Sequence, residues 1–383
     1  MTVAVIGAGT MGSGIAQVAA QAGHTTYLFD TRKEAVGKAI AGLGKTFDKL
    51  VEKGKLTAEK ATEIKARIKP ATDLKELAGC GLVIEAIIED LGIKKKLFAE
   101  LESLLSADAV LATNTSSLSV TAIAAACARP ERVVGLHFFN PAPLLPLVEV
   151  VPGLATDEAL ASRMYALMQT WGKTPVVCKD TPGFIVNRVA RPFYGEAIRI
   201  YEEGIADMPT IDAAMKSVGF KMGPFELMDL IGNDINFTVT RTVWEAFFFD
   251  PRYKPSFTQQ RQVESGRFGR KSGRGYYSYP EGVALTFPTV EAPIADPIVE
   301  RVLAMLINEA ADALFWKVAS AADIDLAMTK GVNYPKGLLA WADEKGASHW
   351  LGILEALQQR YAEDRYRPSP LLKQASGVKR SLR

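Results

Sequence analysis

The sequence is poor in cysteine and histidine and carries almost no net charge. Its three cysteines, Cys80, Cys127 and Cys178, lie far apart and are odd in number, so we expect neither a disulfide framework nor a metal site. Lysine and arginine total 45 against 43 acidic residues, which gives a formal charge of +2. This balance disfavours binding to nucleic acid or to an anionic membrane surface.

Long hydrophobic runs are missing as well. Charged residues interrupt every apolar stretch, as Glu85 and Glu89 do after the run Gly81–Ile84, so no segment offers the roughly 20 apolar residues of a membrane span. The chain passes from Met1 into the apolar run Val3–Ile6 without the basic region and cleavage site of a signal peptide. We therefore expect a cytoplasmic protein without membrane contact.

The first half of the chain alternates short β-branched runs with longer helical patterns, which predicts parallel strands joined by crossover helices. A long helical stretch from about Lys33 to Lys69 separates the second strand from the third. Seven strands are expected, at Val3–Ile6, Thr25–Phe29, Leu82–Ile87, Ala109–Thr113, Val133–Phe138, Val148–Val151 and Pro175–Cys178. The predicted fold class is α/β, a Rossmann-type doubly wound sheet followed by two tandem all-helical domains.

The helical part of the chain contains an internal repeat. Ile185-Val186-Asn187-Arg188, Glu196-Ala197, Ile211-Asp212 and Gly223 recur as Ile298-Val299-Glu300-Arg301, Glu309-Ala310, Ile324-Asp325 and Gly337, with a single one-residue slip. Such spacing indicates a tandem duplication. We expect a sheet domain at residues 1–180, a first helical domain at 181–279, a proline-containing linker at 280–296 and a degenerate second copy at 297–383.

A glycine-rich segment directly follows the first expected strand and opens a helix; it reads Gly7-Ala8-Gly9-Thr10-Met11-Gly12. Gly7 permits a tight turn, Gly9 lets a pyrophosphate approach the backbone, and Gly12 allows close packing of helix on strand. The positive end of the helix attracts the anion. Asp30 ends the second strand, where a carboxylate can bind an adenosine ribose, so NAD is favoured as the cofactor. Arg32 weakens this preference over NADP, because its guanidinium could bind a 2′-phosphate.

Of only three histidines, His137 ends an apolar strand, the edge at which doubly wound sheets place their sites. Glu149 lies inside an otherwise apolar strand and needs a partner there, for which an imidazole N–H is suitable. The pair would suit a general base and the carboxylate that orients it. A strand-end histidine alone is more often structural. His24 and His349 have only such a structural interpretation.

Four segments together resemble the bacterial NAD-dependent L-3-hydroxyacyl-CoA dehydrogenases nearly letter for letter: Gly7–Gly12, Asn114–Leu118, His137–Pro141 and Asp180–Arg188. Within this family the chain resembles the 3-hydroxybutyryl-CoA and 3-hydroxyadipyl-CoA dehydrogenase types. Its extra helical copy is similar to that of the 3-hydroxyadipyl-CoA dehydrogenases. The resemblance implies reversible oxidation of an (S)-3-hydroxyacyl-CoA to the 3-oxoacyl-CoA with NAD, at a site in the cleft between the first two domains.

The resemblance also implies roles for individual residues. The catalytic set is His137 as base, Glu149 behind it, and Ser116 and Asn187 around the reacting oxygen. Glu89, Lys94, Asn114 and Lys271 match cofactor contacts, beside Gly7, Gly9, Thr10, Met11, Gly12 and Asp30. Thr46 and Lys53 fall where the family holds CoA, so the expected substrate contacts are Thr46, Lys53, Ser116 and Asn187. The lysines around Thr46 serve equally well as a solvated helix face.

One segment departs from the resemblance: Pro141-Ala142-Pro143-Leu144-Leu145-Pro146-Leu147 stands where relatives commonly read Pro-x-Pro-Val-Met-Lys-Leu. The acyl chain, whether butyryl, longer or adipyl, therefore stays open. Two other functions also stay open, a dehydrogenase of a free hydroxy acid and a non-catalytic dinucleotide-binding protein. Glu300 replaces Asn187 in the second copy, so we expect that copy to be catalytically inactive. We also expect it to take the place of a homodimer partner within the chain.

Overall fold

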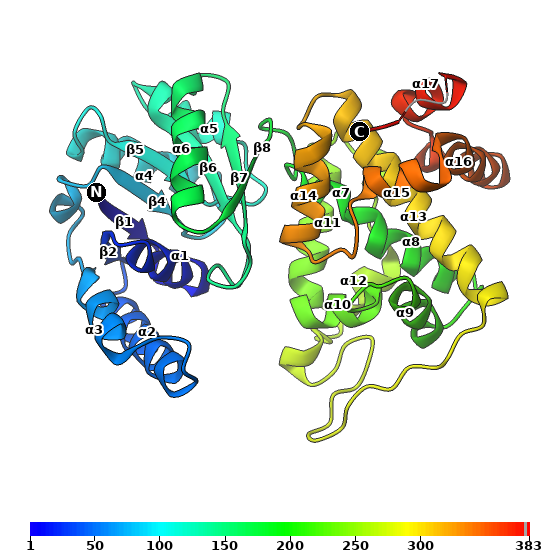
Figure 1. Cartoon of the computed structure of the whole chain (residues 1–383), viewed down its shortest axis with the longest axis horizontal. Coiled ribbons are helices and arrows are strands. Elements are labelled where there is room, and N and C mark those ends of the chain that lie inside the picture. Colours follow the sequence, from blue (N-terminus) through cyan, green and yellow to red (C-terminus); the bar gives the residue numbers. More distant parts are fainter. Residues whose placement is uncertain (379–380) are drawn as a thin grey trace. The chain divides into compact units, whose positions relative to one another are not determined.

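The computed structural model describes residues 1–378 and 381–383. The chain divides into two compact units, Met1–Thr181 and Pro182–Arg383 (Figure 1). The two helical segments that we expected as separate domains both lie in the second unit. None of the helices among the described residues is long and apolar enough to cross a membrane.

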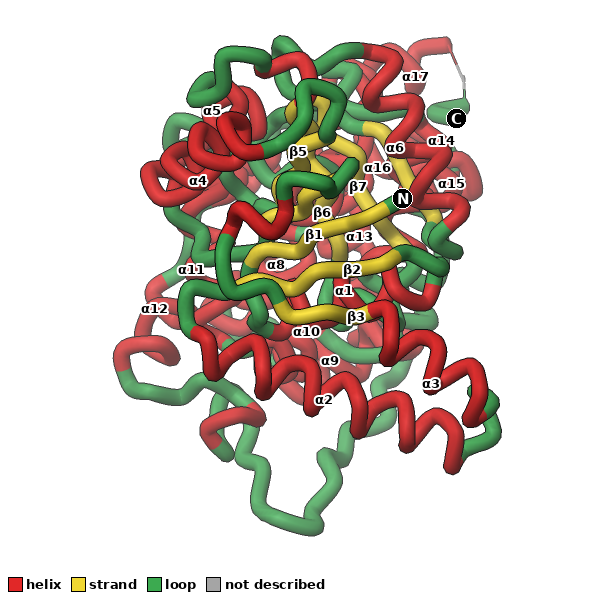
Figure 2. Tube along the Cα trace, turned by 90° about the vertical axis from the view of Figure 1, so that its left-hand side faces the viewer, coloured by secondary structure: helices red, strands yellow, loops and turns green. Residues whose placement is uncertain are grey.

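In the described part of the first unit, eight strands form one sheet in the order β3-β2-β1-β4-β5-β6-β7-β8 (Figure 2). Their bounds are β1 Thr2–Ile6, β2 Thr25–Phe29, β3 Ile68–Pro70, β4 Leu82–Glu85, β5 Val110–Thr113, β6 Val133–Phe138, β7 Leu147–Pro152 and β8 Thr174–Val177. Neighbours pair in parallel except β6 and β7, which are antiparallel. The expected doubly wound sheet is confirmed.

Helices cover both faces of this sheet, which explains why its central strands are apolar over most of their length. Helices α1 (Thr10–Gln21) and α6 (Glu158–Thr170) pack on one face through Ile15 and Met164. Helices α4 (Leu91–Leu104) and α5 (Val120–Ala124) pack on the other through Phe98 and Ile123. The carboxyl ends of β1, β4, β5 and β6 therefore open side by side along one edge, because these four strands are neighbours and parallel.

The expected helical stretch from Lys33 to Lys69 is divided into two helices and ends in a strand. The segment forms α2 (Lys33–Glu52) and α3 (Ala58–Arg67), followed by the short edge strand β3, which we had not predicted. Gly54 adopts the left-handed conformation at φ +66°, and the Thr57 hydroxyl accepts the backbone N–H of Lys60 to start α3. A left-handed glycine ends one helix and a threonine cap begins the next, so the stretch folds into a hairpin.

The second unit is helical. Its helices are α7 Val186–Val189, α8 Arg191–Glu202, α9 Met208–Ser217, α10 Pro224–Ile231, α11 Asn233–Ala246, α12 Phe257–Glu264, α13 Ala292–Phe315, α14 Ala321–Gly331, α15 Leu338–Lys345, α16 Ala347–Tyr361 and α17 Pro370–Val378. Helix α13 begins inside the expected linker and includes Pro297. Burial of Ala295, Ile298 and Val299 outweighs the one backbone hydrogen bond that Pro297 cannot donate.

Two fully buried carboxylates join the two segments of the repeat. Glu309, on α13, accepts from Arg188 Nε at 2.5 Å, Arg252 Nη1 at 3.2 Å and Tyr253 Oη at 2.5 Å. This set ties the second segment to the first. Because each oxygen of Glu309 has a charged or hydroxyl donor, burial is compensated.

The reverse contact uses the corresponding residues. Glu196, on α8, accepts from Arg301 Nε at 3.0 Å, Arg365 Nη1 at 3.1 Å and Tyr366 Oη at 3.1 Å. In the repeat these donors correspond to Arg188, Arg252 and Tyr253, and Glu196 corresponds to Glu309. The contact is thus reciprocal, as in an interface with twofold symmetry.

Asp212 and Asp325 also occupy matching positions of the repeat. Asp212 accepts the N–H groups of Phe225 and Glu226 at 2.9 and 2.8 Å, and Asp325 caps α15 in the same way. A Cβ on Gly223 would lie 2.3 Å from Asp212, so this close approach requires glycine. Burial raises the pKa of Asp212 to about 7, against the hydrogen bonds that it accepts.

We predict that this burial makes folding stability depend on pH. The folded state holds a proton on Asp212 up to about pH 7, whereas the unfolded chain releases it near pH 4. Asp212 therefore lowers the free energy of unfolding as pH rises from about 4 to 7. Denaturant unfolding should show Asp212→Asn gaining stability relative to the wild type across this range.

The control variant is Asp207→Asn, which removes the exposed cap of α9. Hydrogen bonds from Thr210 lower the pKa of Asp207, so both states are ionised above about pH 5 and the difference from wild type should stay constant. A constant difference for Asp212→Asn as well would contradict the prediction.

Candidate active site

The glycine-rich turn after β1 has different requirements at its three glycines. Gly7 has φ +105°, and a Cβ there would lie 2.4 Å from the carbonyl oxygen of Ala86. A Cβ on Gly12 would lie 1.8 Å from the carbonyl oxygen of Gly7, whereas a Cβ on Gly9 would meet nothing within 4 Å. Folding therefore requires glycine at Gly7 and Gly12, while the space at Gly9 is available to a ligand.

Helix α1 begins beside this space without a side-chain cap or an acidic residue in its first turn. Thr10 and Met11 are its first two residues, so their N–H groups lie where an intrahelical partner is missing by geometry. The positive end of the helix dipole adds to them. The turn therefore has the properties of an anion site, and the residues present fit a pyrophosphate.

Asp30, just after β2, contacts the same turn. Its Oδ2 accepts the N–H of Ala8 at 2.9 Å, and its Oδ1 accepts from Arg32 N at 2.9 Å and Arg32 Nε at 3.3 Å. Burial acts to raise the pKa of Asp30, but these hydrogen bonds outweigh it and leave the pKa below its usual value. Asp30 is therefore an ionised acceptor beside the glycine-rich turn, and Arg32, which is exposed, partly neutralises it.

Glu89 organises the loop after β5. It accepts from Thr115 Oγ1 at 2.6 Å and from the N–H groups of Ser116 and Ser117 at 2.9 and 3.1 Å. Lys94 Nζ lies 3.2 Å from Glu89. Burial acts to raise the pKa of Glu89, and Lys94 together with these donors lowers it below its usual value. The structure thus brings Glu89, Lys94 and Ser116 together, as their assignment to one site requires.

The role of Glu85 was not predicted from the sequence, in which it only interrupts an apolar run. Glu85 is fully buried at the end of β4, where it pairs with Lys94 Nζ at 2.6 Å and accepts from Thr113 Oγ1 at 2.7 Å. Lys94 is itself 1% exposed. A carboxylate in an apolar strand nine residues before a lysine was the available signal.

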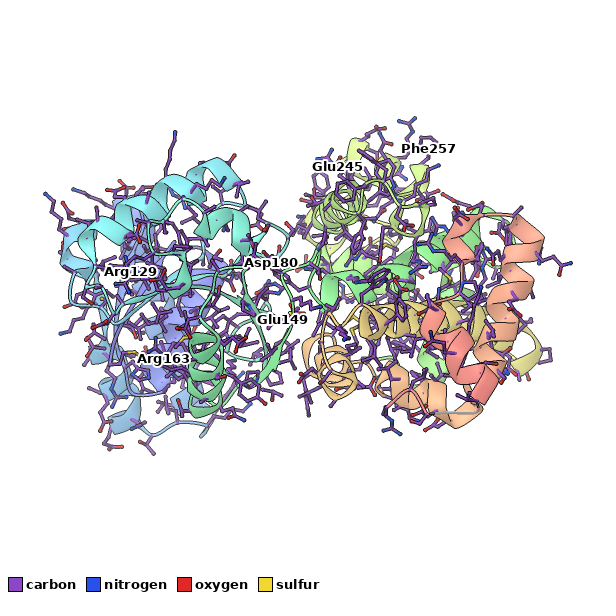
Figure 3. All side chains as sticks on the ribbon, turned by 90° about the horizontal axis from the view of Figure 1, so that it is seen from above. Arg129, Glu149, Arg163, Asp180, Glu245 and Phe257 are labelled. Atoms are coloured by element: carbon purple, nitrogen blue, oxygen red, sulfur yellow. The ribbon has the colours of Figure 1, made fainter. Side chains whose placement is uncertain are left out.

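His137 and Glu149 lie directly opposite each other on the antiparallel strands β6 and β7. His137 Nδ1 is 2.7 Å from Glu149 Oε2, and both side chains are buried (Figure 3 labels Glu149). The Phe139 ring packs on the imidazole at 4.4 Å between centroids. Next to them, Asn114 Oδ1 accepts the N–H of Phe138 at 2.8 Å, which joins the end of β5 to the end of β6.

The remaining predicted residues lie elsewhere. Thr46 and Lys53 are exposed at the carboxyl end of α2, and Thr46 Oγ1 donates to the carbonyl of Gly42 at 3.0 Å. Asn187 (on α7) and Lys271 belong to the second unit. Lys271 is half-exposed and pairs with Asp234 at 2.6 Å.

The proline-rich segment that departs from the resemblance is held by a lysine that sequence reasoning did not identify. Lys173 Nζ donates to the carbonyl oxygens of Ala142 and Leu145, and burial lowers the pKa of Lys173 to about 8. Lys173 lies just before β8, so the cation that binds the proline-rich segment comes from a later part of the chain.

Comparison with known proteins agrees with this geometry. The family model for the NAD binding domain of 3-hydroxyacyl-CoA dehydrogenase matches residues 2–181. The model for the C-terminal domain of the same family matches residues 183–279 and again residues 298–381. The chain is 43% identical over 459 aligned positions to the 3-hydroxyadipyl-CoA dehydrogenase of Escherichia coli (strain K12), with 97% of each chain covered.

Solved structures extend the comparison. The crystal structure of a 3-hydroxybutyryl-CoA dehydrogenase from Escherichia coli K12 matches with a TM-score of 0.93 and 42% identity, over 99% of this chain and 98% of that chain. The (S)-3-hydroxybutyryl-CoA dehydrogenase from Ralstonia eutropha matches with a TM-score of 0.71 and 38% identity. That alignment covers 99% of the relative but 73% of this chain, so the relative is shorter.

The fold, the glycine-rich turn and the two family models together define a dinucleotide-dependent oxidoreductase. More particularly, the chain belongs to the 3-hydroxyacyl-CoA dehydrogenase family. It is an NAD-dependent enzyme that acts on an acyl-CoA.

We predict that Asp30 sets the preference for NAD. Asp30→Ala removes both a ribose acceptor and a charge that repels a 2′-phosphate. The KM for NAD should therefore rise about tenfold, and the difference between the KM values for NAD and NADP should become smaller. Asp30→Asn keeps an oxygen that can accept the N–H of Ala8 but loses the charge. It should also reduce the difference between the KM values for NAD and NADP, with a smaller rise in the KM for NAD. Steady-state kinetics with both cofactors measure this. Equal use of NAD and NADP by the wild type would show that Arg32 governs the site.

Proposed function

We propose that this dehydrogenase oxidises the 3-hydroxyl of an (S)-3-hydroxyacyl-CoA with His137 as the general base. The observation that carries the assignment is the 2.7 Å contact between His137 Nδ1 and Glu149 Oε2. With Nδ1 engaged by the carboxylate, Nε2 is the ring nitrogen that takes the hydroxyl proton. NAD, when bound, accepts the hydride from the same carbon.

Glu149 fixes the tautomer and favours the imidazolium that forms during oxidation. Because Glu149 sits at the middle of a buried strand and His137 opposite it, the sheet itself holds the ring orientation. This rigidity supports proton transfer, which requires the base within hydrogen-bond reach of the hydroxyl.

Ser116 and Asn187 are proposed to donate hydrogen bonds to the reacting oxygen, which becomes a ketone or develops negative charge in the reverse direction. Glu89 fixes the backbone of Ser116, so it acts as a positioning residue for that donor. Thr46 and Lys53 are proposed contacts for CoA, which carries phosphates that a lysine can pair with. The exposed position of Lys53 at the end of α2 supports this role.

The names of the relatives suggest the acyl groups to examine. Relatives are named 3-hydroxyadipyl-CoA and 3-hydroxybutyryl-CoA dehydrogenase, and the coverage of the E. coli relative includes both helical segments. We propose a 3-hydroxyacyl-CoA of about four to six acyl carbons as substrate.

We also propose that residues 297–383 are a degenerate copy of residues 181–279 that takes the place of a homodimer partner. The reciprocal pairing of Arg188 with Glu309 and of Arg301 with Glu196 supports this, because corresponding residues exchange across a twofold interface. Glu300, at the position of Asn187, pairs with Lys345 at 2.9 Å and lacks the carboxamide. The copy is therefore structural.

The proposed role of His137 as the base leads to a prediction. His137→Gln should retain NADH binding, since the turn at Gly7 and Asp30 are unchanged, and should lower kcat about 10²–10⁴-fold. Glu149→Gln should also lower kcat, and the double variant should lose little more than either single one, because the two side chains act as a unit.

The control is His24→Gln, because His24 packs against Trp171 and takes no part in the proposed reaction. Its kcat should equal that of the wild type. Near wild-type turnover of His137→Gln would remove His137 from its role, and fully additive losses would show that the two residues are not coupled.

Another prediction concerns the second copy, residues 297–383. A chain that ends at Glu281 loses Arg301 and Arg365, the partners of buried Glu196. In a dimer of such chains, Arg188 and Arg252 of each copy could pair with Glu196 of the other, so sedimentation should show dimers or aggregates. Glu300→Ala in the full chain should leave kcat unchanged. A truncated chain that stays a stable monomer would show that the second copy replaces no partner.

A further inference from the structure

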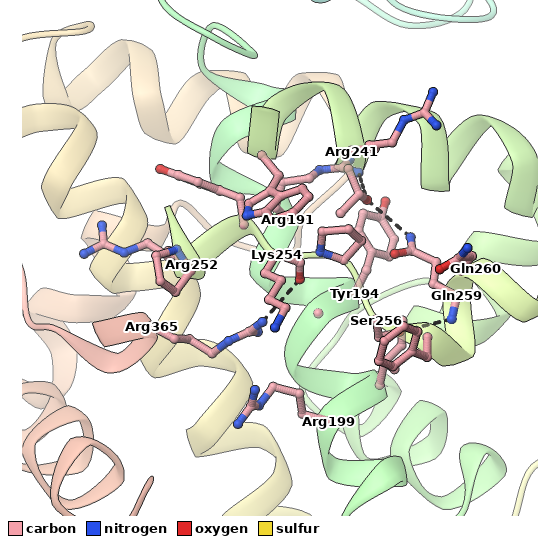
Figure 4. A pocket seen from close by; sticks show the side chains of 18 of the residues that line it. Arg191, Tyr194, Arg199, Arg241, Arg252, Lys254, Ser256, Gln259, Gln260 and Arg365 are labelled. Atoms are coloured by element: carbon pink, nitrogen blue, oxygen red, sulfur yellow. Dashed lines mark hydrogen bonds between the residues drawn. The ribbon is translucent and has the colours of Figure 1, made fainter. Parts of the chain in front are cut away.

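A large cavity lies wholly within the second unit, between α8, α11, α12 and the turn at residues 362–365 (Figure 4). Its volume is about 1130 Å³, enough for an organic ligand. Aromatic side chains form much of its wall: Tyr194, Phe237, Trp244, Phe249, Tyr253 and Phe257. The cavity therefore suits a ligand with an apolar part.

The charged side chains of the cavity favour an anion. Six cationic residues line it, Arg191, Arg199, Arg241, Arg252, Lys254 and Arg365, against three carboxylates, Glu202, Glu363 and Asp364. Glu363 is already bound by Arg199, at 3.0 and 3.2 Å. Arg252 and Arg365 are held by Glu309 and Glu196. Arg199, Arg252 and Arg365 are thus committed to the fold.

Arg191 differs from these three, because its guanidinium lies over the Tyr194 ring, 4.9 Å from the centroid, and pairs with none of the described carboxylates. Its side chain is 7% exposed, its Nε donates to the carbonyl oxygen of Asn187 at 2.9 Å, and its Nη1 donates to Thr240 Oγ1 at 3.2 Å. Its Nη2 bonds to none of the described residues. Burial lowers the pKa of Arg191, and no carboxylate opposes this effect. The other buried arginines of the described chain each pair with a carboxylate: Arg132, Arg188, Arg252, Arg301 and Arg365.

A buried guanidinium without a counter-charge is costly, so its retention calls for a reason. The repeat shows that the fold does not require it, because the corresponding position of the second copy is Ala304, which is fully buried in α13. Thr240, which binds Arg191, corresponds to Leu354, which is fully buried in α16. The polar pair is therefore confined to the copy that carries Asn187.

The position of Arg191 relative to Asn187 indicates which kind of anion Arg191 could bind. Arg191 follows Asn187 by four residues, about 6 Å along a helix, and bonds to its carbonyl. In the proposed function the Asn187 amide contacts the oxygen on C3 of the acyl chain. An anion near Arg191 is thus only a few carbon–carbon bonds from the reacting carbon. A carboxylate at the far end of a short acyl chain satisfies this spacing, and a 3-hydroxyadipyl group ends in one.

We propose that Arg191, positioned by Thr240 and Gln259, binds the terminal carboxylate of a dicarboxylic 3-hydroxyacyl-CoA and so selects that substrate over a monocarboxylic one. This inference rests on the proposed function, because it places the acyl chain from Asn187. Gln259 Nε2 donates to Thr240 Oγ1 at 3.2 Å and to Asn236 Oδ1 at 2.7 Å, which fixes the hydroxyl that Arg191 bonds. The methylene groups would contact the aromatic wall.

The test compares two thioesters of equal length, 3-hydroxyadipyl-CoA and 3-hydroxyhexanoyl-CoA, which differ only in the terminal carboxylate. The wild type should show a kcat/KM about 10²-fold higher for 3-hydroxyadipyl-CoA. Arg191→Met should lose about 10²-fold on 3-hydroxyadipyl-CoA and keep or improve its rate on 3-hydroxyhexanoyl-CoA. Arg191→Lys should retain an intermediate preference, because it keeps the charge but not the planar fork.

The matched control is Arg261→Gln, an exposed arginine of α12 outside the cavity, which should leave both rates unchanged. A second measurement needs no turnover: titration of the enzyme, without NAD, with adipyl-CoA and hexanoyl-CoA, which carry no 3-hydroxyl. Adipyl-CoA should bind the wild type more tightly, and Arg191→Met should abolish the difference.

The outcomes separate the two proposals. Oxidation of neither thioester by the wild type would overturn the proposed function. Oxidation of both at equal rates would leave that function standing and overturn the role of Arg191. Equal losses on both thioesters in Arg191→Met would also overturn it, because the CoA phosphates are common to both and such losses would assign Arg191 to CoA or to the fold.

Discussion

The second unit depends on two buried carboxylates, Glu196 and Glu309, each held by two arginines and a tyrosine from the other segment of the repeat. Removing one partner of a buried ion pair costs about 3–5 kcal/mol, because the remaining charge stays buried. Separating the segments would uncover both carboxylates at once. The helical part therefore behaves as one compact unit, although its sequence consists of two copies.

The two copies share the residues that join them and differ at residues for which we propose a role in catalysis or binding. Arg188 and Glu196 recur as Arg301 and Glu309, whereas Asn187 recurs as Glu300 and Arg191 as Ala304. A buried pair resists change at either residue, because any single substitution leaves a charge without its partner. A residue that serves a ligand has no such constraint once its copy no longer meets that ligand. The differences between the copies thus separate structural arginines from those available for binding.

Sequence patterns predicted the elements whose causes are local. The strands and the glycine-rich turn follow from periodicity and backbone conformation, and they are confirmed. The division of α2 from α3 at Gly54, the edge strand β3 and the start of α13 before Pro297 were not predicted, because a glycine turn, a three-residue pairing and core burial decided them. The exchange of arginines between the segments was equally out of reach, since identical motifs do not show which copy each side chain contacts.

The geometry of the His137–Glu149 pair depends on the antiparallel pairing of β6 with β7. A parallel neighbour of β6 would end at the same edge, so the residue opposite His137 would lie at the strand end, close to solvent. Because β7 runs the other way, residues from its interior face the end of β6, and Glu149 stands opposite His137 with Val148 and Val150 on either side. The carboxylate is fully buried, and the imidazole, at the end of β6, is 6% exposed. Water competes poorly for such a carboxylate, so the contact with Glu149 holds the imidazole in one orientation.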